Sequence, residues 1–159
     1  MSGRDDIRAA VFAGNFDDVE AIVAENPRSV RRIVGLMYGL DEDIRTNCAK
    51  ALVIAAKYHP KLIKRVIKNL VWAMDEQSGT YAPTAPEILK IIANDNPELL
   101  VPMMGELVRL ASDSSLNEGL SSILRVVANR CPGELGRKLA KSLNTQMKYG
   151  KQCHIASRR

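Results

Sequence analysis

Four stretches of the sequence run from an alanine to a proline: Ala24-Glu25-Asn26-Pro27, Ala56-Lys57-Tyr58-His59-Pro60, Ala93-Asn94-Asp95-Asn96-Pro97 and Ala128-Asn129-Arg130-Cys131-Pro132. Their prolines are 33, 37 and 35 residues apart, a period typical of repeats made of two helices. Proline in the first turn of a helix loses no hydrogen bond, and it holds the preceding residue in an extended conformation. Each stretch therefore predicts a corner between two helices, where Asn26, His59, Asn96 and Cys131 occupy the N-cap position of the second helix.

Apolar residues recur in register on both sides of the four prolines. After the proline, at offsets of three, seven and ten to eleven, stand Val30, Ile63, Leu100, Leu135; Val34, Ile67, Met104, Leu139; and Met37-Tyr38, Leu70-Val71, Leu107-Val108, Ser142-Leu143. Before it, at offsets of eight, five and four, stand Val19, Leu52, Leu89, Leu124; Ile22, Ala55, Ile92, Val127; and Val23, Ala56, Ala93, Ala128. Such spacings lie on one face of a helix at about 100° per residue, so each unit is predicted to be a pair of amphipathic helices.

The pattern predicts helices near residues 4–13, 17–25, 27–39, 42–58, 60–74, 84–94, 97–111, 116–130 and 132–146. Asp41 and Thr84 are the expected caps of the helices that follow them. Pro102 is expected to disturb the helix that begins at Pro97. Residues 1–146 form one helical domain in this interpretation, and residues 147–159 form a basic tail that is expected to be mobile.

The arrangement resembles the HEAT and armadillo class of helical-repeat proteins over residues 1–146. The stretch Trp72-Ala73-Met74-Asp75-Glu76-Gln77-Ser78-Gly79, with Pro86-Glu87 in the next helix, is also similar to an element of small prokaryotic HEAT-like proteins of unsettled activity. The resemblance implies an all-α fold, a right-handed superhelix of about four two-helix repeats. The usual HEAT pattern places a proline within the first helix, whereas here the proline lies at the corner.

Composition and charge limit the classes of function. The chain has 159 residues, of which 46% are apolar and 4% aromatic, and its net charge is +5. The charge alternates along the chain: −4 over residues 1–26, +7 over 27–74, −6 over 75–123 and +8 over 124–159. No apolar run approaches the roughly 20 residues of a membrane span and the first residues carry no apolar leader, so a cytoplasmic protein is expected. The three cysteines, Cys48, Cys131 and Cys153, have neither disulfide-framework nor metal-ligand spacing.

Motifs of enzymes and cofactor sites are absent from the sequence. No glycine-rich phosphate loop occurs, His59 lies in a cap position, and His154 adjoins Cys153 in the tail. We therefore expect no catalytic residue, no metal and no cofactor. The longest connection between predicted helices begins with Asp75 and Glu76 and contains Tyr81, which makes it a secondary contact site or a solvated turn. Helical-repeat DNA glycosylases resemble the chain in architecture only.

Basic side chains gather opposite the apolar face of the predicted second helices. The candidate partner-binding residues are Arg31, Arg32, Lys64, Arg65, Lys68, Trp72, Arg109, Arg137 and Lys141. Second helices of stacked repeats line the concave binding surface, so these residues would form a basic groove that Val101 and Pro102 interrupt. The leading hypothesis is a non-enzymatic scaffold that binds an acidic segment of a protein partner. The alternative is a nucleic-acid-binding repeat protein that uses the same groove and the tail; an ordinary solvated helix face would carry the same charges.

Overall fold

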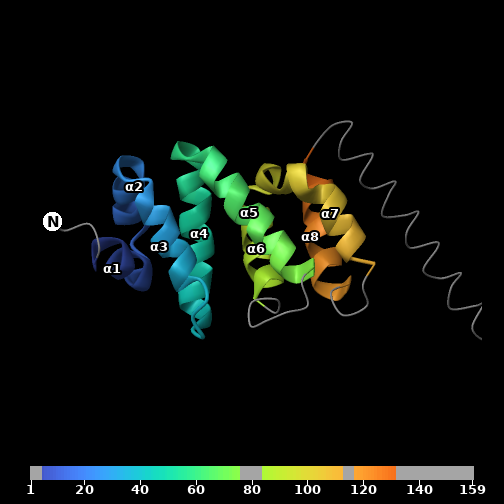
Figure 1. The fold of residues 1–159 in the computed structure, drawn as a ribbon, viewed down its shortest axis with the longest axis horizontal. Helices are drawn as coiled ribbons and strands as arrows, with labels where there is room; N and C mark the ends of the chain where they lie inside the picture. Colours follow the sequence, from blue (N-terminus) through green and yellow to red (C-terminus); the bar gives the residue numbers. More distant parts are fainter. Residues whose placement is uncertain (1–4, 76–83, 113–116, 132–159) are drawn as a thin grey trace, which may run out of the picture.

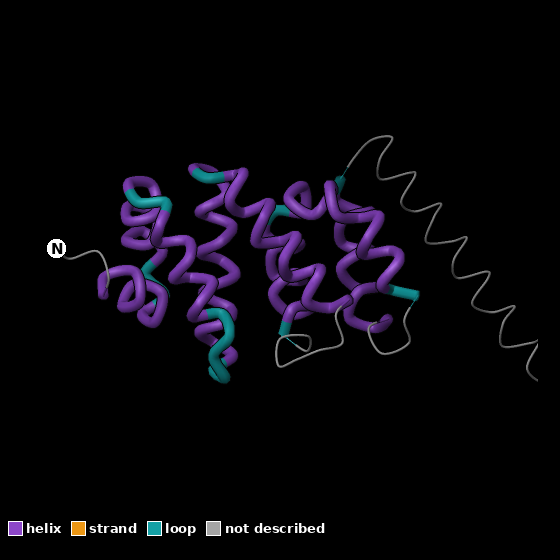
Figure 2. Tube along the Cα trace, in the orientation of Figure 1, coloured by secondary structure: helices purple, strands orange, loops and turns teal. Residues whose placement is uncertain are grey.

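A computed structural model describes residues 5–75, 84–112 and 117–131 of the chain. Within these ranges every regular element is a helix, and short turns join the helices, as Figure 2 shows. The elements are α1 (Asp5–Ala13), α2 (Phe16–Glu25), α3 (Arg28–Leu36), α4 (Glu42–Tyr58), α5 (Pro60–Asp75), α6 (Ala85–Asp95), the 3₁₀ segment η1 (Pro97–Met103), α7 (Met104–Leu110) and α8 (Asn117–Arg130) (Figure 1). The all-α class predicted from the sequence is confirmed for the described residues. The predicted helix at 132–146 and the tail lie outside them.

Local signals fix two of the helix starts. Gly14 has a φ of +65°, a left-handed conformation that glycine adopts without strain, and it ends α1. The side chain of Asn15 then accepts a hydrogen bond from the Asp18 N–H at 3.4 Å, which caps α2. Asp41 caps α4 in the same way, because its Oδ1 accepts from the Ile44 N–H at 3.1 Å. The predicted role of Asp41 is therefore confirmed.

The proline corners at Pro27, Pro60 and Pro97 form where the sequence predicts them, whereas Pro132 lies outside the described residues. The N–H groups of Asn26, His59, Asn96 and Cys131 donate to carbonyl oxygens four residues earlier, at 2.8 to 3.0 Å, and so close the preceding helix. The Asn26 side chain also accepts through its Oδ1 from the Arg28 N–H at 3.0 Å, so it acts at the start of α3 as predicted. Each of these residues thus ends the helix that precedes it.

Two predicted side-chain caps were wrong. Asn96 makes no cap hydrogen bond with its side chain, because the Leu99 N–H donates to the main-chain carbonyl of Asn96 in a 3₁₀ turn. Thr84 makes none either, since its backbone is already helical and a cap needs an extended conformation.

His59 is structural, although it does not cap its own helix. The N–H groups of Leu62 and Ile63 donate to its main-chain carbonyl at 3.1 and 3.2 Å. Its ring Nε2 lies 2.8 Å from the Val23 carbonyl oxygen, to which it donates. The imidazole therefore joins the corner after α4 to the last turn of α2.

The helices pack in two layers. The first helices of the pairs pack on one another in order, α2 on α4, α4 on α6 and α6 on α8. Figure 1 shows α3, α5 and α7 in front of α4, α6 and α8. In that second layer α5 packs against both η1 and α7, whereas α3 and α5 do not pack closely. The additional helix α1 contacts α2, α3 and α4.

The apolar register found in the sequence describes most of the core between these layers. The residues eight positions before the prolines, Val19, Leu52, Leu89 and Leu124, are fully buried. After the prolines, Ile63, Ile67, Leu100, Met104 and Leu107 are buried as well. Local periodicity was enough to find them because each helix buries a single continuous stripe.

The register was wrong at the end of α3, where Tyr38 is 40% exposed. The predicted helix 27–39 ends at Leu36, because the Gly39 N–H turns back to the Leu36 carbonyl at 3.1 Å. The predicted helix 97–111 is η1 followed by α7. Pro102 lies inside η1, which confirms the predicted disturbance.

Candidate partner-binding cleft

A cleft of about 680 Å³ lies between α3 and α5, the two second helices that do not pack closely. Val30 and Val34 from α3 and Leu62 and Val66 from α5 form its apolar walls. Val30 is buried, but Val34, Leu62 and Val66 are only partly buried. The cleft therefore keeps aliphatic surface within reach of a ligand.

Positive charge surrounds these apolar walls. The polar and remaining lining residues are Arg28, Arg31, Arg32 and Arg65, with Asn69 and Pro27. None of the described residues that line the cleft carries a carboxylate. Arg28, Arg31 and Arg65 are exposed and Arg32 is partly buried. Even without Arg32, three exposed arginines belong to the described lining of this one cleft, a setting that favours carboxylate or phosphate ligands.

Three of the predicted partner-binding residues, Arg31, Arg32 and Arg65, come together in this cleft, although Arg31 and Arg65 lie on different helices. The sequence pointed to their charge but missed the apolar walls. Leu62 and Val66 fall outside the offsets that define the core stripe, and Val34 was expected to be core. In the sequence, the apolar wall on α5 could have been recognised from Leu62 and Val66, two aliphatic residues outside the core stripe.

Lys64, Lys68 and Trp72 lie on the exposed face of α5, beside the cleft and not in its lining. The indole of Trp72 is 51% exposed, and the Lys68 Nζ lies 4.6 Å from its ring centroid, within the range of a cation–π contact. These residues extend the basic surface along α5, toward the end that carries Asp75.

Arg109 does not join the cleft. Its guanidinium lies 2.9 Å from the Asp75 carboxylate and 2.9 Å from the Glu106 carboxylate, and these contacts raise the pKa of Arg109. Asp75, expected as the start of a loop site, is the last residue of α5 and joins α5 to α7 through this ion pair. The basic residues of the second helices are therefore not one continuous, unpaired ladder. Arg137 and Lys141, and Glu76 and Tyr81 of the secondary site, lie outside the described residues.

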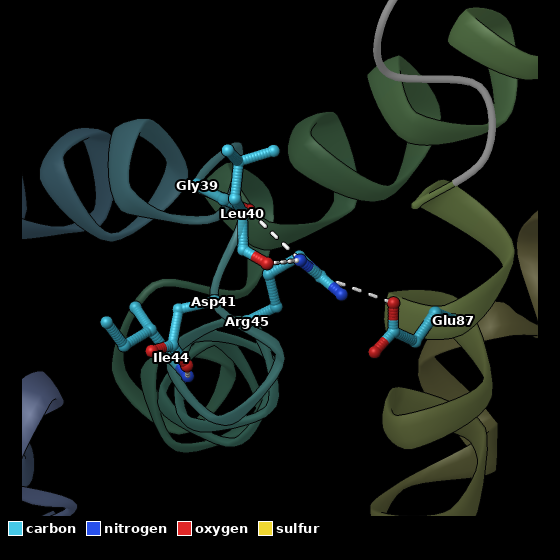
Figure 3. Close-up of polar contacts among 6 residues, drawn as sticks. All are labelled: Gly39, Leu40, Asp41, Ile44, Arg45 and Glu87. Atoms are coloured by element: carbon cyan, nitrogen blue, oxygen red, sulfur yellow. Dashed lines mark hydrogen bonds and ion pairs between the residues drawn. The ribbon is translucent and has the colours of Figure 1, made fainter.

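A structural cluster that sequence reasoning missed holds the turn between α3 and α4 (Figure 3). The Arg45 Nη1 donates to the carbonyl oxygens of Gly39 and Leu40, at 3.1 and 2.7 Å, and its Nε lies 3.3 Å from the Glu87 Oε2 on α6. The Arg45 side chain is only 14% exposed, so it is a partly buried structural residue and not part of the basic surface. In the sequence, the role of Arg45 was indicated only by its position four residues after the capping residue Asp41.

Reactive thiols and metal-binding side chains are not found among the described residues that line the cleft. Burial raises the pKa of the Cys48 thiol to about 12, which keeps it protonated and unreactive at neutral pH. Among the described residues, no three His, Cys, Asp or Glu side chains are grouped so that they could hold a metal ion. The part of the chain that the structure describes also has no helix with both the length and the apolar surface to cross a membrane.

Comparison of the chain with protein-family models, with curated proteins and with solved structures found no match.

Proposed function

We propose that the chain is a non-enzymatic scaffold that binds an acidic segment of a protein partner in the cleft between α3 and α5. The observation that carries the proposal is the composition of that cleft, which combines aliphatic walls with the exposed Arg28, Arg31 and Arg65 and has no carboxylate among its described lining residues. The proposal also treats the helix pairs as about four repeats of a HEAT-like right-handed superhelix. The in-order packing of α2, α4, α6 and α8 supports this view.

An acidic peptide with aliphatic side chains matches both properties of the cleft. Arginine and carboxylate form paired, charge-assisted hydrogen bonds, which fix the orientation of a ligand as well as attract it. Aliphatic side chains of the ligand would cover the exposed parts of Val34, Leu62 and Val66 and so add a hydrophobic contribution. The described lining residues include no Ser, Cys, His, Asp or Glu, which argues for binding and against catalysis at this cleft.

Two observations favour a protein segment over a nucleic acid, the alternative drawn from the sequence. A nucleic acid needs a basic track that follows several phosphates, and Arg109, further along this layer, is already held by Asp75 and Glu106. The one aromatic on the α5 surface, Trp72, is beside Lys68 and outside the cleft lining. The positive charge is concentrated at one opening with apolar walls, which suits a short segment.

The test is fluorescence anisotropy with a labelled peptide of glutamate and leucine. We expect the wild-type chain to bind it and the double variant Arg31→Glu/Arg65→Glu to lose at least tenfold in affinity. Lys90→Glu/Arg125→Glu is the matched control, because it makes the same change of charge at exposed positions of α6 and α8. Equal losses in both double variants would show that only net charge matters, and the cleft would be excluded as the binding site.

A salt series separates the two classes of partner. A nucleic acid that contacts 6–10 phosphates loses about 10³–10⁵-fold in affinity between 50 and 200 mM salt. We expect a much shallower dependence for the peptide, because its aliphatic contacts do not depend on salt. Tighter binding of a single-stranded oligonucleotide than of the peptide, with the steep dependence, would replace the protein partner by a nucleic acid.

A further inference from the structure

The turn between α3 and α4 presents an aliphatic side chain to solvent. Leu40 is 99% exposed, and it is the only aliphatic residue among the large apolar side chains that are exposed in the described part of the chain. The next three residues, Asp41, Glu42 and Asp43, are acidic and exposed. We call residues 39–43 the acidic turn. A leucine followed by three carboxylates is the kind of segment that the α3–α5 cleft would select.

The acidic turn is held in place before any partner arrives. Arg45 donates to the carbonyl oxygens of Gly39 and Leu40, and it is tied in turn to Glu87 of α6 (Figure 3). Asp41 caps α4 through the Ile44 N–H at 3.1 Å, which fixes the other side of the turn. Figure 3 shows the Leu40 side chain directed away from Arg45 and Glu87. Binding through this turn therefore orders little additional backbone, which lowers the entropic cost of association.

The cleft and the acidic turn are complementary in charge and in size. Arg28, Arg31 and Arg65 line the opening, while the turn supplies exposed carboxylates. An apolar cavity of about 150 Å³ holds a benzene molecule. The cleft, at about 680 Å³, has room for one leucine side chain and the backbone beside it.

We infer that a second copy of this chain binds here: Leu40 of one copy enters the α3–α5 cleft of the other, and the carboxylates of the turn meet the arginines at its opening. The inference rests on the proposed function and names the partner. Binding within one molecule is excluded in this structure, because Leu40 is 99% exposed and so does not fill its own cleft.

The contact joins two different surfaces of the chain. Each copy would therefore keep one unused acidic turn or one unused cleft, and assembly would continue head to tail unless a ring closes. The contact covers one turn and one cleft, so it belongs with small, transient interfaces. We expect self-association that depends on concentration.

Sedimentation velocity of the full chain over a series of concentrations tests the inference. The average mass should rise with concentration in the wild type, and it should stay at the monomer value in Leu40→Asp and in Arg31→Glu/Arg65→Glu. Leu40→Met keeps an apolar side chain at the turn and should associate as the wild type does. Because Leu40 is exposed, Leu40→Asp should leave the thermal unfolding curve unchanged. A wild type that stays monomeric, or a Leu40→Asp variant that still associates, would overturn the inference.

Mixing the two variants gives a sharper result. Leu40→Asp keeps an intact cleft and Arg31→Glu/Arg65→Glu keeps an intact turn, so the mixture should form a one-to-one dimer that grows no further. Replacing the double variant by Lys90→Glu/Arg125→Glu, whose cleft and turn are both intact, should restore longer assemblies. No dimer in the first mixture would contradict head-to-tail binding. If Leu40→Asp still binds the glutamate–leucine peptide while the wild type stays monomeric, the proposed function stands and only self-binding fails.

Discussion

The two junctions of α5 with its neighbours in the second layer differ in packing and charge. The helices α5 and α7 are in contact, and Arg109 lies between the carboxylates of Asp75 and Glu106. Between α3 and α5 the helices leave a cleft of about 680 Å³, where Arg28, Arg31 and Arg65 are exposed and no described lining residue is an acid. The first junction uses its arginine to hold two helices together, and the second leaves its arginines at an opening.

The difference shows why position relative to the proline is not enough to define a binding surface. Arg109 and Trp72 occupy the same offset, twelve residues after their prolines. Trp72 is half exposed beside Lys68, whereas Arg109 is held by acids on α5 and α7. The same offset thus carries an exposed aromatic side chain on α5 and an arginine already paired with carboxylates on α7.

Shortening a buried side chain of α5, the helix common to both junctions, should have the largest effect on stability. Ile67 lies on the buried face of α5 and is 1% exposed. Ile67→Ala is expected to lower the free energy of unfolding by about 2–5 kcal/mol, from lost transfer free energy and the cavity left behind. Urea unfolding followed by circular dichroism measures it. Lys64→Ala, on the exposed side of the same helix, is the control and should change stability by less than about 0.5 kcal/mol. Similar losses in both variants would mean that the buried face is assigned wrongly.

The second largest loss of stability is expected when the turn between α3 and α4 loses the hydrogen bonds of Arg45. Arg45 joins the turn after α3 to α6, and its side chain is 14% exposed. Arg45→Met keeps much of the side-chain volume but removes the bonds to Gly39, Leu40 and Glu87. Because hydrogen bonds to charged groups contribute about 1.5–3 kcal/mol, we expect a loss of stability of that order. Faster amide exchange limited to the acidic turn, measured by mass spectrometry, should accompany it. Unchanged exchange there would show that Arg45 does not order the turn.

Much of the helical core, but only part of the site, could be predicted from the sequence. Periodicity found Leu52, Leu89 and Ile67 because the burial of a helical stripe is a local property. The ion pair of Arg109 with Asp75 joins residues 34 positions apart, and that of Arg45 with Glu87 joins residues 42 apart. Offsets within one helix contain no information about such pairs. Whether two second helices close on each other or leave a cleft is likewise decided by packing between units.

Removing the ion pairs between α5 and α7 should lower stability less than the first two changes. Arg109→Ala removes the ion pairs with Asp75 and Glu106, all exposed side chains. Exposed pairs contribute little and are screened by salt, so we expect a small fall in the melting temperature that disappears at high salt. Peptide binding in the α3–α5 cleft should not change, because Arg109 is not in its lining. A loss of peptide affinity in Arg109→Ala would show that the two junctions are not independent.

The smallest effect is expected in the other layer, where Glu20 of α2 meets Tyr58 of α4. The Tyr58 hydroxyl donates to the Glu20 Oε1 at 2.9 Å, and the Lys57 Nζ lies 3.4 Å from the same oxygen. The hydrogen bond from Tyr58, with the charge of Lys57, lowers the pKa of Glu20 from 4.5, and the bond to Glu20 raises the pKa of Tyr58 from 10.0.

The two pKa shifts define the acid and the alkaline limits of the pH range in which the Glu20–Tyr58 contact contributes to stability. A lowered carboxyl pKa means that the contribution of Glu20 to stability is present above pH 4.5 and is lost as the pH falls through the lower value in the folded chain. A raised phenol pKa means that the contribution of Tyr58 is present below pH 10.0 and is lost as the pH rises through the higher folded value. Thermal unfolding from acid to alkaline pH should therefore show a slightly flatter profile in Glu20→Gln than in the wild type. Peptide binding at neutral pH should be the same in both, since neither residue lines the cleft. A difference in peptide affinity would mean that the α2–α4 contact controls the width of the α3–α5 cleft, and the two layers would then have to be treated as one unit.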